Sequence, residues 1–282
     1  MEIEIKDFWQ THPCGAELVG DLTEETRAEC EEFFKRYDDY RYTTEPHILS
    51  NLKGIDFNGK TVLEIGLGQG ADSEQITRRG SKFSGVDLTE EAVKRTKMRF
   101  SLKRLSFDRI EQANALELPF EENSFDIVYS HGVLHHIPEV QKAGQEILRV
   151  LKPDGQLIAM LYAKRSLNYL LVISVLRRLG LLGLYGLGLK ADGIYDDHIQ
   201  NARQAGIWNY LSMKNFIHVS TDGPFNPYSK VYDLSEVRAD FPDFEIVKCE
   251  RYFMHAPPLK VEWLPLAGLL GWHLWVWMNP RK

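Results

Sequence analysis

The sequence predicts an α/β protein with a Rossmann-like, mainly parallel sheet. The first observation is an unbroken unit between Lys60 and Asp87, in which a short apolar strand, a glycine-rich turn, a helix and a second strand ending on an acid follow one another. The second is the alternation of predicted strands and helices as far as Tyr162. Alternation of this kind is typical of parallel sheets, whose strands are joined by helical crossovers.

The opening unit has the chemistry of a nucleotide site. Residues 61–65 are apolar and partly β-branched, as in a buried parallel strand, and residues 71–79 are expected to be helical. The glycines between them let the backbone turn sharply and let a ligand lie close to it. The helix directs its N-terminal amides at that ligand. Asp87, about 20 residues further on, ends the next strand and can accept the hydroxyls of a ribose.

The glycine pattern by itself leaves the ligand open. Gly66-x-Gly68-x-x-Ala71 fits a dinucleotide fingerprint, which allows alanine in the last place. Gly66-x-Gly68-x-Gly70 after Glu64 also resembles the first motif of S-adenosylmethionine (SAM) methyltransferases. A tight turn without a ligand is the third interpretation, so the rest of the chain has to decide.

The segment before the first core strand is expected to be mostly helical. An irregular arm is expected around Phe8 and Trp9, and then a helix over residues 22–42 with Asp21 or Thr23 as its cap. Pro46 opens a shorter helix. Aromatic residues of the longer helix should pack in the core, and the candidates for touching a cofactor are Tyr37, Arg41 and Tyr42.

Beyond Asp87 the strand and helix signals continue to the end of the chain. Strands are predicted at 110–113, 125–130, 156–162, 244–254 and 273–278, and helices at 88–102, 140–151, 208–216 and 235–241.

Composition restricts the class of protein. The net charge of −6 over 282 residues argues against a nucleic-acid binder with a broad basic surface. The three cysteines have no CxxC spacing, so neither a zinc site nor a disulfide framework is implied, and a cytoplasmic location is expected. Arg177 and Arg178 interrupt the leucine-rich stretch 167–189, and we therefore predict contact with a membrane surface at most, not a transmembrane segment.

Four blocks together resemble the class I SAM-dependent methyltransferases of the broad type 11 group, which includes ubiquinone and menaquinone C-methyltransferases. They are residues 62–70, 85–88, 125–137 and 148–155, and they extend over about residues 60–163. The resemblance implies a seven-stranded sheet with an antiparallel last strand. It also implies four parts: an N-terminal helical cap (1–59), a SAM-binding core (60–163), an inserted lid (164–230) and a completion of the sheet (231–282).

The resemblance further implies the cofactor-binding roles. Glu64 would lie near the methionine amino group, the backbone of Gly66, Gly68 and Gly70 would border methionine and ribose, and Asp87 would hold the ribose. The adenine would be surrounded by Leu88, Asn114, Ala115 and Leu116, with the Asn114 carbonyl as an acceptor, and the sulfonium by Ser130 and His131.

Methyl transfer from a sulfonium depends largely on positioning, and a base is needed only where the acceptor keeps its proton. His135 is the first candidate for that base, His136 the second, and Tyr162 could contact the acceptor. His131 and His135 are four residues apart, but Gly132 and a strand end intervene, so no metal site is predicted.

The sequence therefore predicts a SAM-dependent methyltransferase for a small hydrophobic or amphipathic acceptor, with O-methylation slightly ahead of C- or N-methylation. The alternatives are an RNA or protein methyltransferase and a non-catalytic SAM-binding subunit. A homodimer through the leucine-rich helix is a further expectation.

Overall fold

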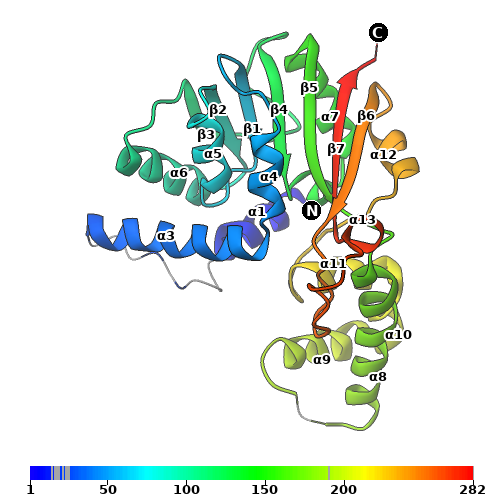
Figure 1. The fold of residues 1–282 in the computed structure, drawn as a ribbon. Helices are drawn as coiled ribbons and strands as arrows, with labels where there is room; N and C mark the ends of the chain where they lie inside the picture. Colours follow the sequence, from blue (N-terminus) through cyan, green and yellow to red (C-terminus); the bar gives the residue numbers. More distant parts are fainter. Residues whose placement is uncertain (14, 16–19, 21, 23–25, 190, 282) are drawn as a thin grey trace.

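The computed structural model describes residues 1–13, 15, 20, 22, 26–189 and 191–281, and its centre is a seven-stranded sheet (Figure 1). The strand order is β3-β2-β1-β4-β5-β7-β6. The strands are β1 (Thr61–Ile65), β2 (Lys82–Asp87), β3 (Arg109–Gln112), β4 (Phe125–His131), β5 (Leu151–Tyr162), β6 (Phe244–Tyr252) and β7 (His273–Pro280).

All strands are parallel except β7, which pairs antiparallel with both β5 and β6. The predicted fold class, with an antiparallel last strand, is therefore confirmed. Because β7 runs against its neighbours, its first residue, His273, lies at the edge where the parallel strands end. Side chains from β4, β5 and β7 can meet at that edge.

Helices cover both faces of the sheet. One face packs against α4 (His47–Lys53), α5 (Ala71–Thr77) and α6 (Glu90–Lys103), which contribute Ile48, Ile76 and Phe100 to the core. The other face packs against α7 (Val140–Val150) and α12 (Leu234–Asp240). Two further helices, α1 (Glu2–Thr11) and α3 (Arg27–Thr44), lie across the end of the first half of the sheet (Figure 1).

A helical unit, which we call the lid, is inserted between β5 and β6 and extends beyond the sheet (Figure 1). It contains a π-helical stretch η2 (Asn168–Arg177), α8 (Arg178–Gly186), α9 (Ile194–Ala205), α10 (Ile207–Tyr210) and α11 (Met213–Thr221). The lid has an apolar cluster of its own, which includes Ile173, Ile199 and Phe216. A short helix α13 (Ala267–Leu270) precedes β7. In the described residues, Asn168–Gly186 is the one helix with the length and apolar composition to cross a membrane, and 17% of it is buried.

Three local predictions differ from the structure. The arm expected around Phe8 and Trp9 is the helix α1, which forms because Ile5 and Phe8 bury one apolar side. The helix expected from residue 22 begins at Arg27, where the Thr26 side chain accepts from the Glu29 amide. The caps proposed for it, Asp21 and Thr23, lie outside the described residues.

The third difference concerns the helix expected over residues 208–216. It is divided into α10 and α11 by Ser212, whose backbone is extended (ψ 137°) and whose hydroxyl donates to the Asn209 carbonyl. A serine that bonds its hydroxyl to a neighbouring carbonyl offers the backbone an alternative to the helix.

Candidate active site

The glycine turn between β1 and α5 has a conformation that only glycine adopts easily. Gly66, Gly68 and Gly70 have φ values of +87°, +52° and +72°. A Cβ atom on Gly66 would lie 2.1 Å from Cγ2 of Val133, on the loop that follows β4. Gly66 is therefore required both by the positive φ of the turn and by the close approach of the loop after β4.

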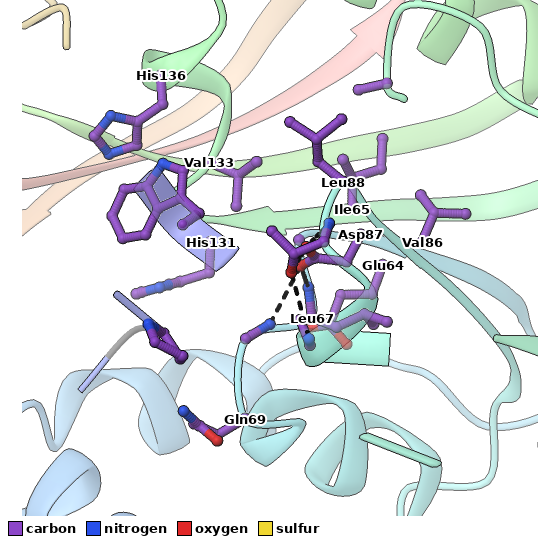
Figure 2. A pocket seen from close by; sticks show the side chains of 18 of the residues that line it. Glu64, Ile65, Leu67, Gln69, Val86, Asp87, Leu88, His131, Val133 and His136 are labelled. Atoms are coloured by element: carbon purple, nitrogen blue, oxygen red, sulfur yellow. Dashed lines mark hydrogen bonds between the residues drawn. The ribbon is translucent and has the colours of Figure 1, made fainter. Parts of the chain in front are cut away.

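Asp87 ties this turn to the end of β2. Its Oδ2 accepts from the amides of Leu67 (2.7 Å) and Gly68 (3.4 Å), and its Oδ1 accepts from the amide (2.9 Å) and hydroxyl (2.8 Å) of Thr89. Burial raises the pKa of Asp87, while the hydrogen bonds from Thr89 and the turn oppose that rise. The carboxylate thus holds the turn in shape and faces the cavity beside it (Figure 2).

A cavity of about 180 Å³ lies over the turn, and the N-terminal helices cover it. Ile5 and Trp9 of α1 line it on one side, and Tyr37 and Arg41 of α3 on another. Figure 2 shows Asp87, Leu88, His131 and His136 around the same space. Of the predicted cofactor residues, those that line the cavity are Glu64, Gly66, Gly68, Asp87, Leu88, Asn114, Ala115 and His131.

Three predicted cofactor residues are not among the described residues that line the cavity: Gly70, Leu116 and Ser130. Gly70 is the αL residue that begins α5. Leu116 packs in the core. Ser130 is fully buried and donates to the carbonyl of Ile65 (3.0 Å), which joins β4 to β1. These three residues therefore stabilise the turn, the core and the strand pairing beneath the cavity.

Asn114, on the wall of the cavity, makes a contact that the sequence did not predict. The Asn114 amide nitrogen donates to Glu2 of α1 (2.7 Å), and its carbonyl accepts from the Leu116 amide (3.0 Å). A carbonyl oxygen has two lone pairs, so one remains for an adenine amino group. Asn114 therefore connects the covering helix α1 to the floor of the site.

Glu64 lies at the buried end of the cavity and is 2% exposed. Ser73 of α5 donates its hydroxyl to the carboxylate. Burial raises the pKa of Glu64 well above its usual range, and the nearby Asp72 carboxylate adds to the rise. A carboxyl group in this state is suited to receive a cation, because a bound ammonium would compensate its charge.

A buried network around Asp72 anchors α3 to the glycine turn. Arg41 donates to Asp72 from Nε (3.2 Å) and from Nη2 (2.8 Å), and the hydroxyls of Tyr42 (3.1 Å) and Tyr129 (3.0 Å) also donate. Burial would raise the pKa of Asp72, but the Arg41 guanidinium outweighs it and holds the pKa below its usual range. Arg41 also donates to Nδ1 of His131 (3.2 Å). Tyr37, Arg41 and Tyr42 were candidates from the sequence, whereas Asp72 and Tyr129 were not.

The two adjacent histidines after β4 have different surroundings. His135 is fully buried, is not among the described residues that line the cavity, and burial lowers its pKa well below the usual range. His136 lines the cavity, with its ring 5.0 Å from that of Trp9. The Nδ1 of His136 lies 2.8 Å from the Tyr228 carbonyl, which only accepts, so this nitrogen carries a proton.

The lid contributes an acid to this group. Oδ2 of Asp222 lies 3.6 Å from Nε2 of His136, and Oδ1 of Asp222 accepts from the Tyr162 hydroxyl (2.8 Å). Tyr162 stacks on Trp272 with ring centroids 4.5 Å apart. Asp222 was not a candidate from the sequence, because only the folded lid loop brings it to the end of β4 and β5.

Comparison with known proteins agrees with this geometry. A family model described as "Methyltransferase domain" matches residues 63–159. Residues 63–159 match a methyltransferase domain, and the sheet has the class I methyltransferase fold. SAM is the cofactor of that class, and the domain includes the glycine turn, Asp87 and the loop after β4.

Two relatives of known name match a part of the chain. A phthiotriol/phenolphthiotriol dimycocerosates methyltransferase of Mycobacterium tuberculosis is 35% identical over 103 residues, which are 36% of this chain and 37% of that protein. Phosphoethanolamine N-methyltransferase 2 of Caenorhabditis elegans is 34% identical over 120 residues, 40% of this chain and 28% of that one. The chain thus matches 37% of the length of the first relative and 28% of the second.

Solved structures share the fold over nearly the whole chain. A protein of Pyrococcus horikoshii OT3 has a TM-score of 0.57 at 17% identity, with 98% of this chain and 99% of that one covered. A SAM-dependent methyltransferase from Aquifex aeolicus has a TM-score of 0.52 at 15% identity, with 92% and 100% covered. At such identities the likeness concerns the fold.

Proposed function

We propose that the chain is a SAM-dependent methyltransferase for a small hydrophobic or amphipathic acceptor, and that oxygen is the methylated atom. The observation that carries the proposal is the cavity between Asp87 with its glycine turn and the covering helices α1 and α3. Its wall carries a buried carboxyl at one end and an imidazole, His136, at the other. These are the groups that a sulfonium amino acid and a hydroxyl acceptor need.

The cofactor is tested by calorimetric titration of the full chain with S-adenosylhomocysteine and, in parallel, with NAD. We expect binding of the first and none of the second. Methyl incorporation from labelled SAM into a panel of apolar hydroxyl compounds then tests catalysis. Cofactor binding without incorporation into any acceptor would favour the alternative of a non-catalytic SAM-binding subunit.

His136 is our candidate for the base. Since Nδ1 donates to the Tyr228 carbonyl, the lone pair of a neutral ring is on Nε2, which is buried and has no hydrogen-bond partner among the described residues. A proton taken there would be stabilised by Asp222, which Tyr162 holds in place. His135 has the less suitable position, since it is enclosed and its ring stays neutral.

The assignment of the base is tested with His136→Gln, Asp222→Asn and His135→Gln. We expect His136→Gln to lower kcat by roughly 10²- to 10⁴-fold with little change in S-adenosylhomocysteine affinity. Asp222→Asn should lower kcat less. If His135→Gln removes activity in a folded protein while His136→Gln does not, the base is His135.

The lid surface supports an amphipathic acceptor that is taken from a lipid surface. Large apolar side chains are exposed along it, among them Leu179 (61%), Leu187 (75%) and Trp208 (76%). Residues 164–230 hold eight Lys and Arg against four Asp, in a protein whose net charge is −6. A leucine-rich segment with an excess of basic residues and an exposed tryptophan suits an anionic membrane interface. The M. tuberculosis relative is named for dimycocerosates, which is compatible with an apolar acceptor.

Vesicle co-sedimentation tests this part of the proposal. We expect the protein to sediment with vesicles that contain anionic lipid, less with neutral ones, and less at high salt. Leu179→Asp and Leu187→Asp should weaken sedimentation, while Val247→Asp, at a position 51% exposed on β6, should not. Equal sedimentation of all three variants, or dimerisation that hides the lid, would overturn it.

A further inference from the structure

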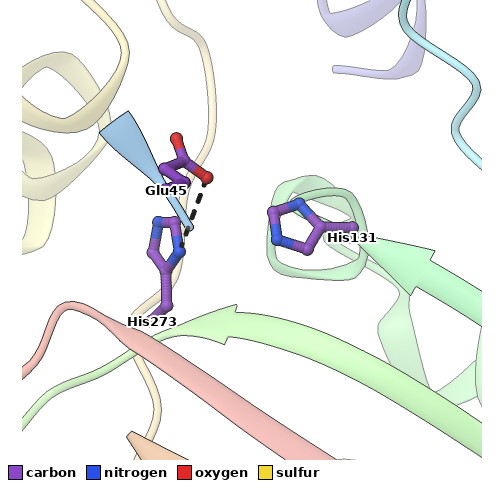
Figure 3. A group of neighbouring side chains, drawn as sticks. All are labelled: Glu45, His131 and His273. Carbon is purple, nitrogen blue, oxygen red and sulfur yellow. Dashed lines mark ion pairs between the residues drawn. The ribbon is translucent and has the colours of Figure 1, made fainter. Parts of the chain in front are cut away.

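A second group of ligating side chains lies at the edge of the sheet beside the cavity. Glu45, His131 and His273 each direct one oxygen or nitrogen atom to a common point, and these atoms lie within 4.8 Å of one another (Figure 3). Their elements are far apart in the sequence. Glu45 directly follows α3, His131 ends β4 and His273 begins β7.

The sheet register explains why the two histidines meet. His131 is paired with Met160 of β5, and His273 is paired with Tyr162 of the same strand from the other side. Met160 and Tyr162 are two residues apart, so they face the same side of the sheet. The two imidazoles therefore project from the same face of the sheet, on either side of β5. Glu45 lies between α3 and α4, and its carboxylate comes close to both rings.

Two atoms of this group lack hydrogen-bond partners among the described residues. Oε2 of Glu45 and Nε2 of His131 are buried and accept or donate no hydrogen bond within the described part of the chain. A buried polar atom without a partner costs about 1–3 kcal/mol. Two such atoms at one point indicate that a group outside the protein completes the site.

The distances fit a coordinated cation. Ligand atoms at about 2.0–2.1 Å from a tetrahedral zinc ion lie roughly 3.3 Å from each other. Nδ1 of His273 lies 3.8 Å from Oε2 of Glu45 and 3.1 Å from Nε2 of His47. The group is thus slightly open relative to a filled site, and His47 contacts one of its ligands, His273, from outside.

We propose that Glu45, His131 and His273 bind a zinc-like divalent cation beside the cofactor cavity. Two imidazoles and one carboxylate form a ligand set found in zinc sites, where a fourth position is left for water or substrate. The nitrogen ligands exclude magnesium and calcium as preferred ions, because both take oxygen ligands. His131 belongs to both the cation site and the cavity wall, so the cation would lie at the boundary between them.

Binding changes the contact of His131 with Arg41. In the structure Arg41 donates to Nδ1, which puts the proton of the neutral ring on Nε2. A cation takes the lone pair of Nε2, so that proton moves to Nδ1, and Nδ1 no longer accepts from Nη2 of Arg41. Arg41 keeps its charge partner, since Asp72 accepts from both Nε and Nη2. This bidentate pair also offsets the positive charge that would otherwise repel the cation.

The proposal is tested on the full chain, stripped with a chelator, by titration with Co²⁺ and then by competition with Zn²⁺. We expect one equivalent of Co²⁺ to produce the intense visible bands of a four- or five-coordinate site, and Zn²⁺ to remove them. Glu45→Gln and His273→Gln should weaken Zn²⁺ binding at least about tenfold. The matched control His198→Gln, a buried histidine of the lid, should bind as the wild type does.

Two further measurements keep the outcomes separate. X-ray absorption at the zinc edge of the wild type reports imidazole ligands even if a variant fails to fold. S-adenosylhomocysteine titration of the same samples reports the cofactor site independently. Only the weak bands of six-coordinate Co²⁺ in the wild type, or unchanged Zn²⁺ affinity in folded Glu45→Gln and His273→Gln, would overturn the cation site and leave the proposed methyl transfer untouched.

Discussion

Replacement of Asp87 by asparagine removes one charge and changes one atom, and it should damage both the turn and the cofactor site. Both carboxylate oxygens accept from backbone amides, Oδ2 from Leu67 (2.7 Å) and Oδ1 from Thr89 (2.9 Å). An asparagine presents an oxygen on one side and an NH₂ group on the other. In either orientation, one backbone N–H faces another donor and loses its partner.

The magnitude follows from these contacts. One orphaned buried N–H costs about 1–3 kcal/mol of folding free energy. A ribose hydroxyl that donates to a carboxylate contributes roughly 1.5–3 kcal/mol, because the acceptor is charged. Loss of one such bond corresponds to about a 10- to 150-fold weaker affinity for S-adenosylhomocysteine.

Calorimetry with S-adenosylhomocysteine and urea unfolding of the same preparations provide the two readouts. The matched control is Asp154→Asn, which replaces an exposed acid near the start of β5. It should change neither the affinity for S-adenosylhomocysteine nor the stability in urea. If Asp87→Asn binds the ligand as tightly as the control does, the carboxylate does not contact the ribose, and the reasoning about this site fails.

Two other substitutions test the backbone turn and the electrostatics of the sheet. Gly66→Ala should destabilise the fold by about 1–3 kcal/mol and abolish cofactor binding, because φ is +87° and the new Cβ would overlap Val133. The control is Gly183→Ala, at an open position in a helix, which should be neutral or stabilising in thermal unfolding. Burial would raise the pKa of Asp126, but Lys152 and a backbone amide outweigh it and hold the pKa at about 2. A depressed pKa stabilises the fold above the unfolded value near pH 4, and that contribution is lost as the pH falls toward 2. Asp126→Asn should therefore cost about 1 kcal/mol at pH 7, since solvent screens the pair, and progressively less in acid; a cost that does not depend on pH in urea titrations would contradict this.

The glycine turn and its strands could be predicted because their signals are local. An apolar β-branched run, glycines at fixed spacing and an acid about 20 residues later lie within one short unit. The start of the helix α6 is equally local, because the Thr89 side chain accepts from the amide of Ala92 three residues on. α1 was missed because its stability comes from Ile5 and Phe8 packing on the rest of the protein, which no local pattern reports.

The site beyond the turn depended on contacts between distant segments. Asp72 and Arg41 are 31 positions apart, and nothing near either residue signals their pairing. The choice between His135 and His136 depends on one turn of 3₁₀ helix, which directs adjacent side chains to different surroundings. Their roles as catalytic residues stay predictions. Gly132 and the strand end between His131 and His135 argued against a metal site there, whereas the ligands proposed here come from three separate elements.

The position of β7 has a consequence for the order in which the chain folds during synthesis. β6 is made before β7, yet β7 is its partner in the sheet, so β6 stays unpaired until the last strand emerges. The free N–H and C=O groups of an unpaired strand edge can form hydrogen bonds with another chain and so promote aggregation. β7 also buries Trp275 and Trp277, so a late step in tryptophan fluorescence would report the closure of this half of the sheet.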